Sequence, residues 1–174
     1  MLDPDINFYD ESVFPFLNIF KNNYDVIYKE YLSAPIHTIS STWKDNDIHN
    51  DKWDVIGLRY QKEDFPEHTK LFPQLCSIYN SLPVEIETIG FSILKPKCEI
   101  FEHVNDNASH IANNLLRGHF CLTTNPKAAL VVNGEIKTWQ PGNAFVFDDK
   151  KRHSAYNRGV TPRINILFDF HLTK

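Results

Sequence analysis

The sequence has no run approaching the roughly 18 apolar residues that a membrane-spanning helix needs. It also has no basic excess, because 18 Lys and Arg residues stand against 22 Asp and Glu, a formal charge of −4. That balance offers no basic patch to nucleic acid and no polybasic stretch to a membrane surface. Residues 1–7 carry neither a basic segment nor an apolar core, so we expect no signal peptide.

Cysteine and glycine are also scarce, with 3 and 6 residues respectively. Cys76, Cys98 and Cys121 include no Cys-x-x-Cys pair, which argues against a disulfide scaffold and a thiolate zinc site and makes the cytoplasm the expected location. Few glycines with 13% aromatic residues indicate a packed chain rather than a disordered one. The length of 174 residues suits a single domain over 1–174 with a sizeable core.

Two helices are expected in the first half of the chain. Aromatic and aliphatic residues recur at helical spacing over 11–32, and a helix there would begin near Pro15, since proline suits a first turn. Its apolar stripe is best explained by core packing. The same spacing recurs over 68–82, where Pro73 implies a late start or a kink.

The other parts of this supporting half, about 1–87, are a loop and a strand. Segment 33–52 is polar and is expected to form an irregular loop, with His37 and His49 exposed to solvent. Segment 53–60 is rich in β-branched and aromatic residues and predicts a strand.

From about residue 88 to 170 the pattern changes to short apolar runs separated by turn residues. Asn133-Gly134 is the strongest hairpin signal, because a two-residue loop requires positive φ at both positions. This pattern predicts a mainly β fold, a double-stranded β-helix (a jelly-roll or cupin-like barrel) buttressed by the N-terminal helices. The expected strands are 88–94, 98–103, 116–123, 128–133, 135–139, 144–148, 154–157 and 163–170.

Two histidines of this barrel, His103 and His153, are candidate metal ligands. They lie 153 − 103 = 50 residues apart, and closure of a jelly roll can bring such distant strands together. Spacing alone leaves open that both are ordinary core or surface histidines.

The motifs around them occur in a recognisable order. These motifs are Phe91-Ser-Ile-Leu-Lys-Pro, Glu99-Ile-Phe-Glu-His, Leu116-Arg-Gly-His, Trp139-Gln-Pro-Gly-Asn-Ala-Phe-Val-Phe-Asp-Asp, His153, Asn157 and Pro162-Arg. Over roughly residues 88–170 the chain resembles the aspartyl/asparaginyl β-hydroxylase family of Fe(II)- and 2-oxoglutarate-dependent oxygenases. The resemblance implies that His103 and His153 bind iron. It also implies that Arg163 and Ser92 hold the distal carboxylate of 2-oxoglutarate, where a bidentate guanidinium suits a carboxylate.

Arg117 and His119 flank Gly118 on one expected strand, so they point to the same face. The resemblance implies that they hold the oxoglutarate carboxylate nearest the iron. An inward-facing Arg117 among apolar residues would need an anionic partner in any case. Asp148 and Asp149 would either orient an imidazole or cap a turn.

The third iron ligand departs from the common His-x-Asp pattern, because the second position after His103 is Asn105. Asp106 follows and would face the other way on a regular strand, so it becomes a candidate ligand only if the chain bulges there. Some family members lack this carboxylate and use two histidines with water.

The implied activity is hydroxylation of a C–H bond of an amino acid, peptide or other small substrate, with succinate and CO₂ as co-products. The alternative is a non-catalytic, cupin-like metal- and anion-binding domain, which Asn105 motivates. Neither a nucleic-acid partner nor a membrane segment is expected, and the oligomeric state is not readable from the sequence.

Overall fold

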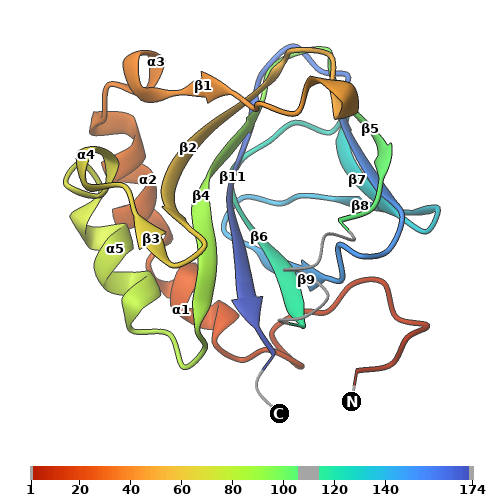
Figure 1. Ribbon diagram of the computed structural model, residues 1–174, viewed down its shortest axis with the longest axis horizontal. Helices are drawn as coiled ribbons and strands as arrows, with labels where there is room; N and C mark the ends of the chain where they lie inside the picture. Colours follow the sequence, from red (N-terminus) through yellow and green to blue (C-terminus); the bar gives the residue numbers. More distant parts are fainter. Residues whose placement is uncertain (1, 106–113, 173–174) are drawn as a thin grey trace.

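The computed structural model describes residues 2–105 and 114–172, which form two facing β-sheets with helices packed outside one of them (Figure 1). This is the helix-buttressed jelly roll that the sequence predicts. From β4 onward successive strands alternate between the two sheets, except that β7 and β8 both lie in the smaller sheet. This alternation is typical of a double-stranded β-helix.

The larger sheet has 7 strands in the order β1-β2-β4-β11-β6-β9, with β3 paired to β2. Strand β11 is last in sequence yet central in this sheet, antiparallel to both β4 and β6. The bounds are β1 Ser41–Thr42, β2 Trp53–Tyr60, β3 Glu63–Asp64, β4 Ile86–Leu94, β6 Leu115–Thr123, β9 Ala144–Phe147 and β11 Arg163–His171.

The smaller sheet has 4 strands in the order β5-β10-β7-β8. Its bounds are β5 Cys98–His103, β7 Ala128–Val132, β8 Glu135–Thr138 and β10 His153–Asn157. Asn133 and Gly134 join β7 to β8 with φ of 47° and 81°, so the predicted tight hairpin is confirmed.

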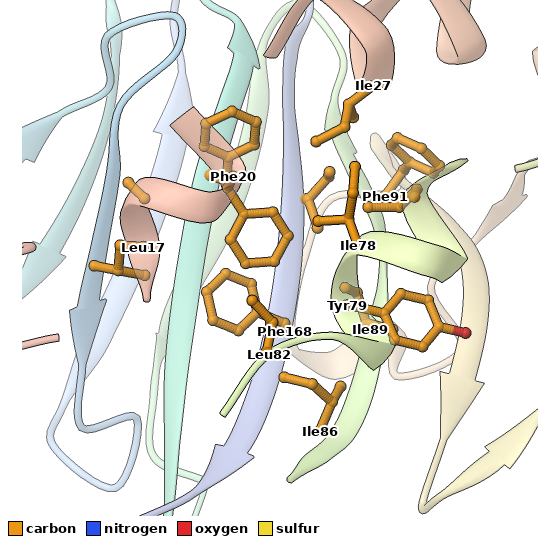
Figure 2. Packing of buried hydrophobic residues seen from close by; sticks show 14 of the residues in the cluster. Leu17, Phe20, Ile27, Ile78, Tyr79, Leu82, Ile86, Ile89, Phe91 and Phe168 are labelled. Atoms are coloured by element: carbon orange, nitrogen blue, oxygen red, sulfur yellow. The ribbon is translucent and has the colours of Figure 1, made fainter. Parts of the chain in front are cut away.

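The helices pack on the outer face of the larger sheet (Figure 1). They are α1 Leu17–Asn22, α2 Tyr24–Ser33 and α5 Pro73–Asn80, with the short α3 Ile36–Ile39 and α4 Pro66–Thr69. Phe20 of α1 stacks on Phe120 and Phe168 of the sheet, with ring centroids 5.5 and 5.0 Å apart. Figure 2 shows Phe20 next to Phe168 in this core. Among the described residues, no helix is long and apolar enough to cross a membrane.

Alternation along β11 separates this packing layer from the barrel interior. Ile164, Ile166, Phe168 and Phe170 belong to the helix-covered core. Arg163 and Leu167, on the opposite face, line the cavity between the sheets. The central strand therefore serves both the structural core and the interior cavity.

The expected helix over 11–32 is wrong in its continuity. Two helices form, the first begins at Leu17, close to the expected start near Pro15, and Asn23 separates them with φ −111° and ψ 15°. Asn23 Nδ2 donates to the Ile19 carbonyl at 2.8 Å, which is the competition with helical bonding that makes asparagine a helix breaker. The late start expected in 68–82 is confirmed at Pro73.

Segment 33–52 is more ordered than expected, since it includes α3, β1 and the 3₁₀ helix η1 Asn46–Ile48. His37 is exposed as predicted, whereas His49 is only 3% exposed. His49 Nε2 lies 3.0 Å from the Trp43 carbonyl, and its Nδ1 accepts from the Asp51 amide at 3.0 Å. The expectation of a solvent-exposed His49 is wrong because these local backbone partners satisfy both ring nitrogens.

Candidate metal and anion site

The interior cavity between the sheets brings together the side chains expected to bind iron and oxoglutarate. The expected residues that line it are Ser92, His103, Arg117, His119, His153 and Arg163. Its volume is about 30 Å³, room for water molecules. Asp106, the candidate third ligand, lies outside the described residues.

His103 and His153 are directly opposite each other on the paired strands β5 and β10. Their ring centroids are 4.3 Å apart, with an interplanar angle of 54°. Two imidazoles that share one ion at about 2.1 Å, with a right angle at the ion, have centroids roughly 4.5 Å apart. The pair therefore has the spacing that a common metal ion requires.

A β-bulge gives His103 its orientation. His153 pairs with His103, but Ala155 pairs with Ile100, so β5 has one residue more than β10 over this interval. Without that extra residue, alternation from the inward Ile100 would turn Glu102 inward and His103 outward. The bulge at Phe101 and Glu102 reverses this, a known role of bulges beside functional sites.

Both imidazoles are oriented by backbone carbonyls. His103 Nδ1 lies 2.7 Å from the Phe101 carbonyl oxygen, and His153 Nδ1 lies 2.8 Å from that of Lys151. A carbonyl oxygen only accepts, so each Nδ1 carries the proton and donates. Each Nε2 therefore keeps its lone pair, which is how outer contacts prepare histidines for a metal.

Arg163 is a buried cation, 1% exposed, at the start of β11. Its Nη1 donates to the Ser92 carbonyl at 3.1 Å, and its guanidinium lies over the Trp139 ring at 4.5 Å. Within 2–105 and 114–172, no carboxylate forms an ion pair with it and its buried Nε has no partner. Burial lowers the pKa of Arg163 to about 10, which still leaves it charged at neutral pH. This cation is suited to an anionic ligand.

His119 of β6 is a second buried donor, 5% exposed. Burial, followed by the charges of Arg163 and Arg117, holds its pKa well below the usual value, so the ring is neutral. Trp139 Nε1 donates to its Nδ1 at 3.3 Å, which places the remaining proton on Nε2. That Nε2 is buried without a partner among the described residues.

Arg117, by contrast, is already paired. Its Nε and Nη2 donate to the two carboxylate oxygens of Asp169 at 2.7 and 2.9 Å, and Nη2 lies 3.2 Å from Asp149. Burial lowers the pKa of Arg117, but the two carboxylates raise it above its usual value overall. Asp148, unlike Asp149, caps a turn by accepting from the Lys150 amide at 3.1 Å.

Ser92 lies on β4 and bridges two donors. Its hydroxyl accepts from Trp53 Nε1 at 2.9 Å and lies 3.4 Å from Arg163 Nη1. Because both neighbours are donors, the hydroxyl proton is available to an acceptor in the cavity.

Several supporting residues were not identified from the sequence. Trp53 and Trp139 hold Ser92 and His119, and Asp169 holds Arg117. A signal existed for Asp169, because a carboxylate inside an apolar strand requires a buried cation. Its register partner on β6 is Arg117 itself, which only the sheet order reveals.

The buried imidazoles predict acid sensitivity of the metal-free protein. Burial, followed by the charge of His103, lowers the pKa of His153 to about 4. Below pH 6.5, His153 is therefore protonated in the unfolded chain but stays neutral in the folded chain until the pH approaches 4. We expect the unfolding free energy to fall by about 2 kcal/mol between roughly pH 7.5 and pH 5 through His153, and further through His119. Urea unfolding of EDTA-treated protein measures this, and an unchanged slope in His153→Gln would contradict it.

A larger groove of about 480 Å³ lies elsewhere, between α2, α3 and the nearby strand ends. Its charged lining residues Asp54 and Lys95 neutralise each other in a 2.8 Å ion pair. No unpartnered buried polar atom among the described residues lines it, so we place the functional site in the interior cavity.

Solved structures define the class of fold. A prolyl-4-hydroxylase from Pseudomonas putida aligns with a TM-score of 0.57 and 12% identity, covering 90% of this chain and 87% of that one. A 2OG-Fe(II) oxygenase family oxidoreductase from Burkholderia pseudomallei gives 0.55 and 12%, with 86% and 78% covered. The fold is the jelly roll that these two structures share.

The family model for aspartyl/asparaginyl β-hydroxylase matches residues 21–172, and the chain belongs to that family of hydroxylases. It is 27% identical to the human aspartate β-hydroxylase domain-containing protein 2 over 154 residues, 84% of this chain and 40% of that protein. It is 25% identical to an ornithine lipid ester-linked acyl 2-hydroxylase of Rhizobium tropici, covering 93% of this chain and 59% of that protein. The chain thus spans about two fifths of the length of its vertebrate relatives.

Proposed function

We propose that this chain is an Fe(II)- and 2-oxoglutarate-dependent hydroxylase acting on a C–H bond of an amino acid, peptide or other small substrate. The observation that carries the proposal is the buried Arg163, which pairs with no carboxylate among residues 2–105 and 114–172 and lines the same cavity as the His103–His153 pair. A cation in that position needs an anion, and paired imidazoles with free Nε2 atoms suit a divalent metal.

His103 and His153 would hold the iron through Nε2, since both Nδ1 protons are engaged by carbonyls. When bound, iron with oxoglutarate and O₂ supplies the oxidation, in which R–H, oxoglutarate and O₂ give R–OH, succinate and CO₂. With two imidazoles as ligands, the metal would keep positions open to the keto acid and oxygen.

The carboxylates of oxoglutarate would be held from the larger sheet. Arg163 and the Ser92 hydroxyl would bind the distal carboxylate, with Trp139 fixing the guanidinium plane from one side. His119 would donate its Nε2 proton to the carboxylate nearest the metal. Arg117 would add Nη1 there, because Asp169 occupies its Nε and Nη2.

The substrate class is proposed from the family and the site together. Family members are named for aspartate or for an ornithine lipid acyl chain. The small cavity favours a small molecule or a short peptide that approaches the metal from outside the barrel.

The test is oxoglutarate turnover by purified protein with Fe(II), ascorbate and O₂. Free amino acids, Asp- and Asn-containing peptides and an ornithine lipid form the substrate panel. We expect succinate in excess over a metal-free control, and hydroxylated product with one class of the panel. Absence of both turnover and iron binding would refute the proposal.

A second candidate is a non-catalytic metal- and anion-binding domain, which Asn105 favours because it replaces a carboxylate ligand. Titration of oxoglutarate into His103→Ala separates the two. Equal affinity in the variant, with no iron retained by either protein, supports a binding domain that keeps the anion pocket but has lost productive iron. A clear loss of affinity supports a metal that takes part in binding.

A further inference from the structure

Asn105 follows His103 by two residues, and the structure gives it two hydrogen bonds, both to Asp149. Val104 is 39% exposed while His103 and Asn105 are half-buried, so the two flanking residues lie on the same side of the chain. The Asn105 amide N–H donates to the Asp149 carbonyl at 3.0 Å, and its Nδ2 donates to Asp149 Oδ2 at 2.8 Å. Asp149 precedes His153 by four residues, so this contact ties Asn105 to the chain that carries the second imidazole.

The contact with Asp149 also fixes which end of the carboxamide is available. A carboxylate accepts hydrogen bonds, so the nitrogen of Asn105 faces it and the oxygen Oδ1 is turned elsewhere. Asp149 is fully buried and lies 3.2 Å from Arg117, which is itself clamped by Asp169. Each imidazole is oriented in a similar way, because a backbone carbonyl accepts the proton of Nδ1 and Nε2 keeps its lone pair.

The described ranges contain no group of three His, Cys, Asp or Glu side chains that could hold a metal. A divalent ion here would thus have two imidazoles and no carboxylate from these residues. A carboxamide oxygen is a hard neutral ligand of the kind that such ions accept.

We propose that the Asn105 carboxamide oxygen is the third protein ligand of the metal that His103 and His153 bind, and that Asp149 is the residue that orients it. The inference rests on the proposed function. In this arrangement the third ligand is a neutral carboxamide rather than the usual carboxylate. The negative charge of Asp149 then lies behind Asn105 and does not contact the ion.

Mn(II) binding without oxoglutarate tests this, followed by electron paramagnetic resonance. We expect Asn105→Ala to weaken Mn(II) affinity about tenfold or more, the range seen when groups around a metal are removed. The exposed Asn18→Ala is the matched control and should leave the affinity unchanged. In ¹⁷O-labelled water, Asn105→Ala should also show one more Mn-bound water than the native chain.

Asn105→Asp separates a ligand from a structural brace. As a ligand, an aspartate completes a charged triad and raises Mn(II) affinity about tenfold. As a brace only, it loses the bond to Asp149, adds like-charge repulsion and lowers affinity.

The native chain supplies a measurement that needs no variant, because a six-coordinate ion with three protein ligands keeps about three waters rather than four.

Unchanged Mn(II) affinity and water number in Asn105→Ala, or about four waters in the native complex, would overturn the inference and leave a two-imidazole site standing. A native chain that binds no Mn(II) or Fe(II) would instead refute the proposed function itself. The two failures are therefore distinguishable.

Discussion

Replacing Arg163 by methionine is expected to weaken oxoglutarate binding strongly while making the ligand-free protein more stable. Arg163 is buried, and within 2–105 and 114–172 no carboxylate balances its charge. Truncating one partner of a buried charge pair typically costs 2–5 kcal/mol, so we expect affinity to fall at least about 30-fold. Calorimetric titration of oxoglutarate into the Mn(II)-loaded protein measures this.

The stability gain follows from the same burial. Desolvation lowers the pKa of Arg163 to about 10, so the folded chain holds this charge less favourably than the unfolded chain does. Methionine fills a similar volume without a charge, and such replacements of buried ions are often neutral or stabilising by about 1–4 kcal/mol. Urea unfolding without ligand should show this increase.

Arg117→Met is the informative control, because the same change should have the opposite effect on stability. It would leave the buried Asp169 carboxylate without its bidentate guanidinium, and breaking a buried pair costs about 3–5 kcal/mol. The exposed Arg152→Met should change neither stability nor binding by much. If Arg163→Met destabilises as strongly as Arg117→Met and keeps oxoglutarate affinity, Arg163 is a structural residue.

Much of the barrel could be predicted because its rules are local. Period-two alternation placed Arg117 and His119 on one face, and both line the cavity. Turn chemistry placed the hairpin at Asn133-Gly134, where both φ angles are positive. The pairing of His103 with His153 was accessible only through the family resemblance, since their 50-residue separation fixes no geometry.

The remaining features depend on sheet order and on partners far away in sequence. The bulge at Phe101 and Glu102 turns His103 inward, yet nothing in that local sequence marks an extra residue. The pairing of Arg117 with Asp169 requires knowing that β6 and β11 are neighbours. The burial of His49 depends on its contacts with Trp43 and Asp51, in a segment whose composition indicates an exposed loop.

The site is divided between the two sheets. The imidazoles lie on β5 and β10 of the smaller sheet, whereas Ser92, His119 and Arg163 lie on β4, β6 and β11 of the larger one. A dicarboxylic keto acid that chelates the metal would therefore bridge the sheets. Loss of the metal should weaken oxoglutarate binding without removing the contacts from the larger sheet.

His103→Ala tests this division, because it should remove metal binding and leave the anion-binding residues in place. His103 is half-buried, so its removal should change stability by no more than about 1 kcal/mol. Because loss of a contact behind a ligand already reduces metal affinity 10–100-fold, loss of the ligand should reduce it by more than about 100-fold. Hydroxylation should then fall below detection, and oxoglutarate should still bind through Arg163 with roughly tenfold weaker affinity.

The rise in melting temperature on adding a metal measures the loss of metal binding without requiring turnover. Since a ligand that binds only the folded state stabilises it by mass action, Mn(II) should raise the melting temperature of the native chain and of the control His37→Ala, whose imidazole is exposed. His103→Ala should show no such rise. A variant that is stabilised as much as the native chain would mean that the ion binds elsewhere, and the paired imidazoles would then be no more than neighbours in a β-sheet.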